Sequence, residues 1–154
     1  MGRLNSKLPV EVFLQTGRRT PLAYLVKPFT DYFARAFRDA MLEEDWDSCV
    51  NMAREQVKEG AHVLDVCVDY VGRDGVADMR EIAGRFATQA ALPLVFDSTE
   101  PEVMEAGLQL FGGKGILNSA NLEEGEAPGT RLDRVLRLAS EYGAAVICLA
   151  IDEE

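Results

Sequence analysis

Polar side chains stand at the ends of several apolar stretches of this sequence. Asp69, Asp97, Asn118 and Asp152 each close a run rich in apolar residues. A carboxylate accepts hydrogen bonds from a ring N–H paired with an amino group, and a carboxamide both donates and accepts. With few cations nearby, such a set suits a neutral ligand rich in N–H donors, such as an aminopyrimidinone, better than a phosphate.

Two other interpretations of these residues remain open. Asp and Asn are common in turns and helix caps, so Asp97, which precedes Ser98-Thr99-Glu100-Pro101, could simply start a helix. Magnesium is a further possibility, because Asp65, Asp69 and Asp97 could offer it oxygen ligands. Asp65 is harder to explain as a turn residue, since a carboxylate in mid-strand must find donors or have its pKa raised.

The spacing of the apolar residues predicts four strands that alternate with four helices, and hence a parallel sheet. The first helix is capped by Asp45 or Asp47 and ends at Gly60, and the third is capped by Ser98 or Thr99 with Pro101 in its first turn. The other helices are expected over 76–90 and 131–142, and the strands over 62–68, 92–96, 115–118 and 144–151.

The two faces of these strands differ in composition, which favours a barrel wall over an open doubly wound sheet. In the first strand Leu64 and Val66 alternate with Asp65 and Cys67. In the last strand we expect Ile147 and Leu149 under the helices, with Cys148 facing inward. The predicted fold is α/β, a partial (β/α) TIM-type barrel of about five parallel strands, with residues 10–15 as a substitute first strand.

Composition limits the class of protein. The chain has 154 residues, of which 47% are hydrophobic and 27% charged, enough for one globular domain but short of the roughly 250 residues of a complete barrel. A net charge of −10 argues against nucleic-acid binding, and no apolar run is long enough to span a membrane. Cys49, Cys67 and Cys148 are too widely spaced for a disulfide framework or a zinc site, which favours a reducing, cytoplasmic location.

Several motifs then resemble one family. The segments are EGAHVLDVCVDYVGRDG at 59–75, FDST at 96–99, EAGL at 105–108, GKGILNS at 113–119 and YGAA at 142–145. Together, residues 37–154 resemble the methyltetrahydrofolate-binding domain of cobalamin-dependent methionine synthases, a pterin-binding barrel. The resemblance implies that Asp97 and Asn118 bind the pterin, and it suggests the same role for Asp65 and Asp69. It implies methyltetrahydrofolate as ligand, no metal in this region, and cobalamin on another domain.

The start of the chain departs from that family. A Gly-Glu-Arg-Thr-Asn motif on the family's first strand is absent, and residues 8–31 instead resemble the C-terminal tail of periplasmic adaptor subunits of type I secretion systems. Residues 1–38 carry seven Lys and Arg against two acidic residues, whereas residues 39–154 carry nine against twenty-four. We therefore expect an unrelated basic segment over 1–38 fused, at a seam within 36–39, to a partial barrel over 39–154.

The end of the chain falls just past the family's fifth strand, so we expect a truncated methyltransferase region. Half of the pterin contacts at most are predicted to be present, which makes the chain inactive alone and its folate binding weak or absent. The alternative is a non-enzymatic half-barrel. Its exposed sheet edges would join two copies in a homodimer or dock another partner.

Overall fold

A computed structural model describes residues 35–149 of the chain. A helical segment over 35–42 is followed by an alternation of helices and strands, as the sequence predicts. In chain order the elements are α2 (Trp46–Lys58), β1 (Leu64–Cys67), α3 (Gly75–Gln89), β2 (Leu94–Asp97), α4 (Pro101–Leu110), β3 (Ile116–Ala120), α5 (Arg131–Tyr142) and β4 (Ala145–Cys148).

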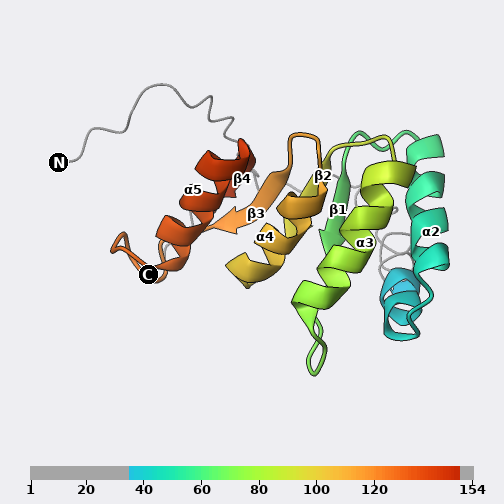
Figure 1. Ribbon diagram of the computed structural model, residues 1–154, viewed down its shortest axis with the longest axis horizontal. Coiled ribbons are helices and arrows are strands. Elements are labelled where there is room, and N and C mark those ends of the chain that lie inside the picture. Colours follow the sequence, from blue (N-terminus) through green and yellow to red (C-terminus); the bar gives the residue numbers. More distant parts are fainter. Residues whose placement is uncertain (1–34, 150–154) are drawn as a thin grey trace, which may run out of the picture.

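The strands form a parallel sheet in the order β1-β2-β3-β4. Helices α3, α4 and α5 lie side by side over one face of this sheet, and α2 packs beside α3 (Figure 1). A doubly wound sheet reverses its strand order and carries helices on both faces, whereas a (β/α) barrel adds each strand next to the last and keeps its helices outside. The fold is therefore α/β, with the topology of an arc of a TIM-type barrel.

The hydrophobic core lies between the sheet and the helices. Leu64 and Val66 of β1 are buried beneath the helices, whereas the intervening Asp65 and Cys67 are exposed on the other face. Phe96 of β2 is fully buried at the centre of the core. A Cβ atom added to Gly107 of α4 would overlap its ring, so the absent side chain allows the close approach of helix and sheet.

One of the two predicted helix caps is confirmed, and two further helices have side-chain caps that were not predicted. The carboxylate of Asp45 caps α2 by accepting from the Ser48 backbone N–H at 3.1 Å, and Asp74 and Thr130 cap α3 and α5. The cap predicted for α4 at Ser98 or Thr99 is wrong. That helix has Glu100 at its N-cap without a side-chain cap bond. The hydroxyls of Ser98 and Thr99 donate to Asp69, and the Ser98 hydroxyl also accepts from the Glu100 backbone N–H at 3.0 Å.

The faces predicted for the last strand are also wrong. Val146 pairs with Leu117 and belongs to the core under the helices, so Ile147 is on the opposite face with its partner Asn118. Cys148 pairs with the buried Ala120 across a register shift in β3 and is itself exposed. Both faces of this strand are apolar in sequence, so the pattern could not show which residues the helices cover.

Several predictions fall outside the described residues: the substitute first strand over 10–15, the segment over 8–31, and Asp152. The predicted seam within 36–39 falls in the helical segment 35–42, where Phe37 packs against the core. Among residues 35–149, no helix has both the length and the apolar character needed to cross a membrane.

Candidate pterin site

The strand register brings three polar side chains into one row on the face of the sheet opposite the helices. Asp97 of β2 is the partner of Cys67 on one side and of Asn118 on the other, and Asn118 is in turn paired with Ile147. Residues paired across parallel strands point to the same face. We call the residues Cys67, Asp97, Asn118 and Ile147 the polar row.

Asp65 is on the same face of the sheet, one step nearer the amino ends of the strands. Its register partner is Val95, which is paired with Ile116, and Ile116 with Ala145. The face opposite the helices thus carries Asp65 in an otherwise apolar row, followed by the polar row near the carboxyl ends. In parallel α/β folds, ligands bind at the carboxyl ends of the strands.

Asp69, which follows β1, has a different set of contacts. One carboxylate oxygen accepts from the hydroxyl of Ser98 at 2.7 Å. The other accepts from the backbone N–H of Thr99 at 2.7 Å and from its hydroxyl at 2.9 Å. Asp69 therefore fixes the loop that follows Asp97, and fewer of its lone pairs are free for a ligand.

Arg131, the first residue of α5, holds the same loop from another element. Its guanidinium donates to the backbone carbonyl of Thr99, to that of Ser98 at 2.8 Å and to that of Ser119 at 2.9 Å. Ser98 follows Asp97 in the chain, and Ser119 follows Asn118. One side chain thus joins the backbone beyond both central members of the polar row.

The environment of this face raises the pKa of its carboxyl groups. Asp65 remains in contact with solvent, but partial desolvation by the surrounding atoms, with the nearby charge of Asp97, raises its pKa to about 6. Burial also raises the pKa of Asp97; the charge of Asp69 adds to this rise and that of Arg131 opposes it. The pKa of the Cys67 thiol is raised in the same way, first by burial. The ionisation of Asp65 and Asp97 is therefore sensitive to what is bound nearby.

Sequence reasoning missed Arg131, although a signal was present. A positive charge in the first turn of a helix opposes the helix dipole and is disfavoured there unless another contact compensates. Arg131 is in that position, directly after the cap Thr130. A basic residue placed against the dipole, just after a loop at the carboxyl end of a strand, could have been singled out on this ground.

The magnesium alternative receives no support from the geometry. Among residues 35–149, no three His, Cys, Asp or Glu side chains are grouped so as to hold a metal ion. Asp69 binds loop donors, while Asp65 and Asp97 are on neighbouring strands two register steps apart.

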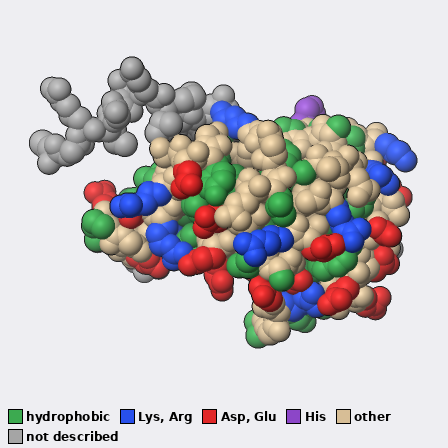
Figure 2. Space-filling view, viewed as in Figure 1, with side chains coloured by type: hydrophobic (Ala, Val, Ile, Leu, Met, Phe, Trp, Pro, Cys, Tyr) green, Lys and Arg blue, Asp and Glu red, His purple; other side chains and the backbone are tan. Residues whose placement is uncertain are grey.

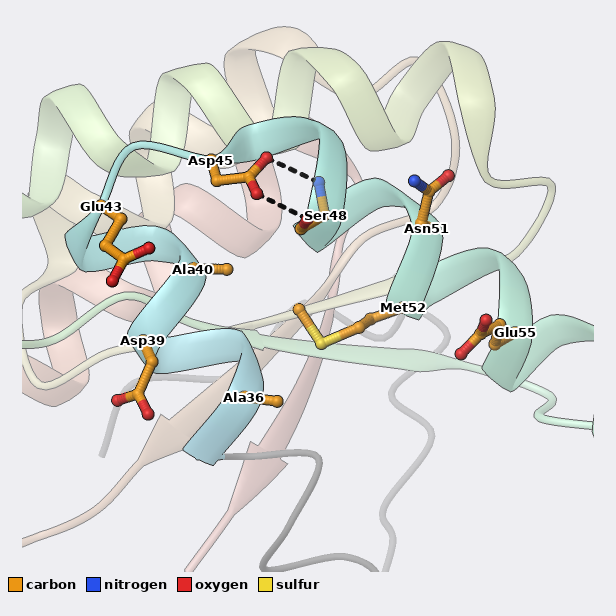
Figure 3. Close-up of a pocket in the computed structure, with 9 residues that line it drawn as sticks. All are labelled: Ala36, Asp39, Ala40, Glu43, Asp45, Ser48, Asn51, Met52 and Glu55. Carbon is orange, nitrogen blue, oxygen red and sulfur yellow. Dashed lines mark hydrogen bonds between the residues drawn. The ribbon is translucent and has the colours of Figure 1, made fainter.

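A separate hollow of about 380 Å³ lies between the segment 35–42 and α2 (Figure 3). Four carboxylates stand around it, and one of them, Asp45, is bonded to Ser48 as a helix cap. No strand residue lines it, so it is distinct from the polar row. Its lining is Ala36, Asp39, Ala40, Glu43, Asp45, Ser48, Asn51, Met52 and Glu55.

Comparison with known proteins shows the family of the chain. Residues 34–154 match the family described as pterin binding enzyme. The chain belongs to this family. The match covers most of the chain and all of its described strands, so the residues of the polar row lie within the matched region.

Two methionine synthases are similar to the chain over the same region. Those of Mycobacterium tuberculosis (strain ATCC 25618 / H37Rv) and Mycobacterium leprae (strain TN) are each 50% identical to it over 121 residues, which is 79% of this chain. That stretch is 10% of the length of each relative. The chain therefore spans only a small part of the length of these relatives.

Proposed function

We propose that this chain carries part of the pterin-binding surface of a methionine synthase-like methyltransferase, with methyltetrahydrofolate as its ligand. The observation that supports this most directly is the register pairing of Asp97 with Asn118 on the face opposite the helices. The two side chains stand on neighbouring strands, so a flat bicyclic ring could contact both at once.

The chemistry of these two residues matches the edge of a pterin ring. The Asp97 carboxylate can accept from a ring N–H and its neighbouring amino group, and the Asn118 carboxamide can donate to a ring carbonyl and accept from a ring N–H. Asp65 is on the same face and would contribute as a further acceptor. Asp69, with its bonds to Ser98 and Thr99, would act chiefly by shaping the loop.

Affinity of the chain alone is expected to be low. Each hydrogen bond contributes about 1 kcal/mol net, and the two or three contacts of the polar row do not offset the several kcal/mol lost on immobilising a ligand. We therefore propose that the chain is inactive by itself. In this proposal, cobalamin and the methyl acceptor are bound by other parts of a longer protein, and methyl transfer depends on those parts.

Titration with methyltetrahydrofolate, followed by ¹H–¹⁵N NMR, tests the proposal. At millimolar ligand, the side-chain amide of Asn118 and the backbone amides of Asp97 and Ser98 are expected to shift. p-Aminobenzoylglutamate, which shares the tail of the ligand but lacks the pterin, should leave them in place. Equal shifts with both compounds, or no shift with either, would contradict pterin binding at this row.

Matched variants separate the row from general charge effects. Asp97→Asn should abolish the Asn118 shift, whereas Glu141→Gln makes the same change of charge on an exposed residue near the end of α5 and should not. Calorimetry should detect no dissociation constant tighter than about millimolar for the unmodified chain. A micromolar constant would contradict the proposal that most contacts come from elsewhere.

The second candidate function is self-association without catalysis. In the described part of the chain, β1 and β4 each pair with a single strand, which leaves one edge of each available for pairing. Light scattering at micromolar concentration separates the two functions. A monomer contradicts the homodimer, and a dimer that forms with or without methyltetrahydrofolate favours it.

Residues 1–33 precede the family match, and we propose that they take no part in pterin binding, as their resemblance to secretion adaptors suggests. Deleting them should leave the NMR shifts caused by methyltetrahydrofolate unchanged. We also propose a cytosolic location, which the free thiols of Cys49, Cys67 and Cys148 fit.

A further inference from the structure

Among the described residues, every side-chain hydrogen bond of Arg131 goes to a backbone carbonyl, two in the loop after β2 and one within β3. The carbonyls of Ser98 and Thr99 follow β2, and that of Ser119 is near the end of β3. A guanidinium presents its N–H donors in a fixed planar fork, so three acceptors bound at once are held in a fixed mutual geometry.

The opposite side of the same loop is held by Asp69. It accepts from the Thr99 N–H, while Arg131 donates to the Thr99 carbonyl, so the backbone at Thr99 is bonded on both its donor and its acceptor. Ser98 is bonded in the same way, through its hydroxyl to Asp69 and through its carbonyl to Arg131. Two opposite charges thus bind neutral backbone and hydroxyl groups between them.

We propose that Arg131 is a positioning residue for the pterin row: by bonding the backbone directly after Asp97 and directly after Asn118, it sets the distance and orientation between these two side chains. The inference rests on the proposed function, since the ligand it serves is the pterin ring. The structural contacts on which it depends exist without the ligand.

Arg131 also acts on the row through its charge. The groups that face Asp97 are Asp69 and Arg131, together with Asp65 and Cys67 on β1. Burial and Asp69 raise the pKa of Asp97, and Arg131 opposes them. Removal of the guanidinium charge should therefore raise the pKa of Asp97 further and reduce the fraction of ionised acceptor near neutral pH.

Two substitutions in the full chain separate geometry from charge. Arg131→Met removes both the fork and the charge, whereas Arg131→Lys keeps the charge and loses the fork. Arg134→Met is the matched control, because Arg134 is one turn along the same helix and pairs with Glu102, away from the loop carbonyls. The measurements are a ¹³C titration of the Asp97 carboxyl, assigned with Asp97→Asn, and the ¹H–¹⁵N shift of the Asn118 side-chain amide.

The proposal predicts a different pattern for each variant. Arg131→Met should raise the pKa of Asp97 and displace the Asn118 amide signal. Arg131→Lys should displace the Asn118 signal while the titration of Asp97 stays near that of the unmodified chain. Arg134→Met should change neither. Unchanged Asp97 and Asn118 signals in both Arg131 variants, or equal changes in Arg134→Met, would overturn it.

These readings need no ligand, so they are independent of whether methyltetrahydrofolate binds. If the unmodified chain shows no response to the ligand while the Arg131 variants behave as stated, the proposed function fails and the positioning of the row stands. If the ligand shifts Asn118 equally in the unmodified chain and in both variants, the function stands and the positioning role fails. Should Arg131→Met not fold, the Asn118 signal of Arg131→Lys alone decides, since that variant keeps charge and approximate size.

Discussion

The two faces of this sheet obey different physical rules. The face under α3, α4 and α5 is apolar and closely packed, with Leu64 3% and Val66 1% exposed. The opposite face carries Asp65, Asp97 and Asn118, and partial desolvation raises the pKa of both carboxyl groups. Packing volume determines what is tolerated on the first face, whereas charge and hydrogen bonding determine it on the second.

The outer surface of the helices adds little to this contrast. Figure 2 shows Lys and Arg interspersed with Asp and Glu over the helices. Several of these side chains form exposed pairs, such as Arg85 with Glu81 one turn earlier in α3. Exposed pairs of this kind contribute about 0.2–1 kcal/mol each. Changes there should matter less than changes on either face of the sheet.

The largest expected effect is on the covered face, at Phe96. Phe96→Ala removes a fully buried ring and should lower the free energy of unfolding by about 3–5 kcal/mol. Urea denaturation followed by circular dichroism measures this change. Phe111→Ala is the control. The Phe111 ring packs edge-on to Phe96, with 6.0 Å between centroids, but it is only partly buried. Its removal should therefore lower the free energy of unfolding by less. Equal losses would contradict the central place of Phe96.

A smaller loss of unfolding free energy is expected when a methyl group is added to α4 where it packs against this face. Gly107→Ala would drive a Cβ atom into the Phe96 ring, and overpacking of this kind costs about 1–3 kcal/mol. The better helix propensity of Ala offsets about 0.5–1 kcal/mol of that loss. A net decrease in unfolding free energy of about 1 kcal/mol should remain in urea titrations.

Gly84→Ala provides the matched control, because a Cβ atom at this position of α3 would meet Leu110 Cδ1 at an ordinary 3.8 Å. It should stabilise the protein by roughly 0.5–1 kcal/mol through helix propensity. A decrease in unfolding free energy for Gly107→Ala and an increase for Gly84→Ala would show that close packing against the sheet, and not helix propensity, determines the effect at Gly107. If Gly107→Ala also stabilised the protein, that result would contradict the close contact described between α4 and the Phe96 ring of β2.

Of the two faces of the sheet, the one opposite the helices is expected to show the smaller effect on stability, and that effect depends on pH. The pKa of Asp65 is raised from 3.8 to about 6 in the folded state, so the unfolded state ionises first as pH increases. Stability should therefore fall between about pH 4 and 6 and then stay lower. Asp65→Asn should reduce that fall, leaving the part that comes from the raised pKa of Asp97, and should gain less than about 1 kcal/mol at pH 7, because solvent screens this face.

Denaturation midpoints measured from pH 4 to 8 check this prediction. Glu141→Gln, which neutralises an exposed carboxylate at the far end of α5, should leave the pH dependence as it is in the unmodified chain. A fall of the same size in Asp65→Asn would show that another group is responsible.

Much of this architecture could be predicted from sequence because each element carries local signals. Asp45 and Asp74 mark helix starts, Gly143 ends α5 in the left-handed conformation at φ 65°, and the alternation in β1 shows which residues are covered. The last strand lacked such a signal. Val146 and Ile147 are both apolar, and only pairing with β3 decides which of them faces the helices.

In the candidate site, too, features set by local sequence could be predicted, and contacts between distant residues could not. The sequence could place Asp97 and Asn118 at strand ends, but it could not show that Ser98 and Thr99 bond to Asp69 and do not cap α4. These contacts join residues about thirty positions apart. The partners of Arg131 could not be seen in the sequence for the same reason, since the loop after β2 and the end of β3 meet it only in the folded chain.

The central claim is that the pterin ring contacts the face of the sheet opposite the helices, at the polar row. Intermolecular nuclear Overhauser effects in the full chain with millimolar methyltetrahydrofolate test it most directly. We predict contacts from the protons of the pterin to the side-chain amide of Asn118 and to the backbone at Asp97. Contacts instead to Met52 and Ala40, in the hollow beside α2, or to residues of the helix-covered face, would contradict the account.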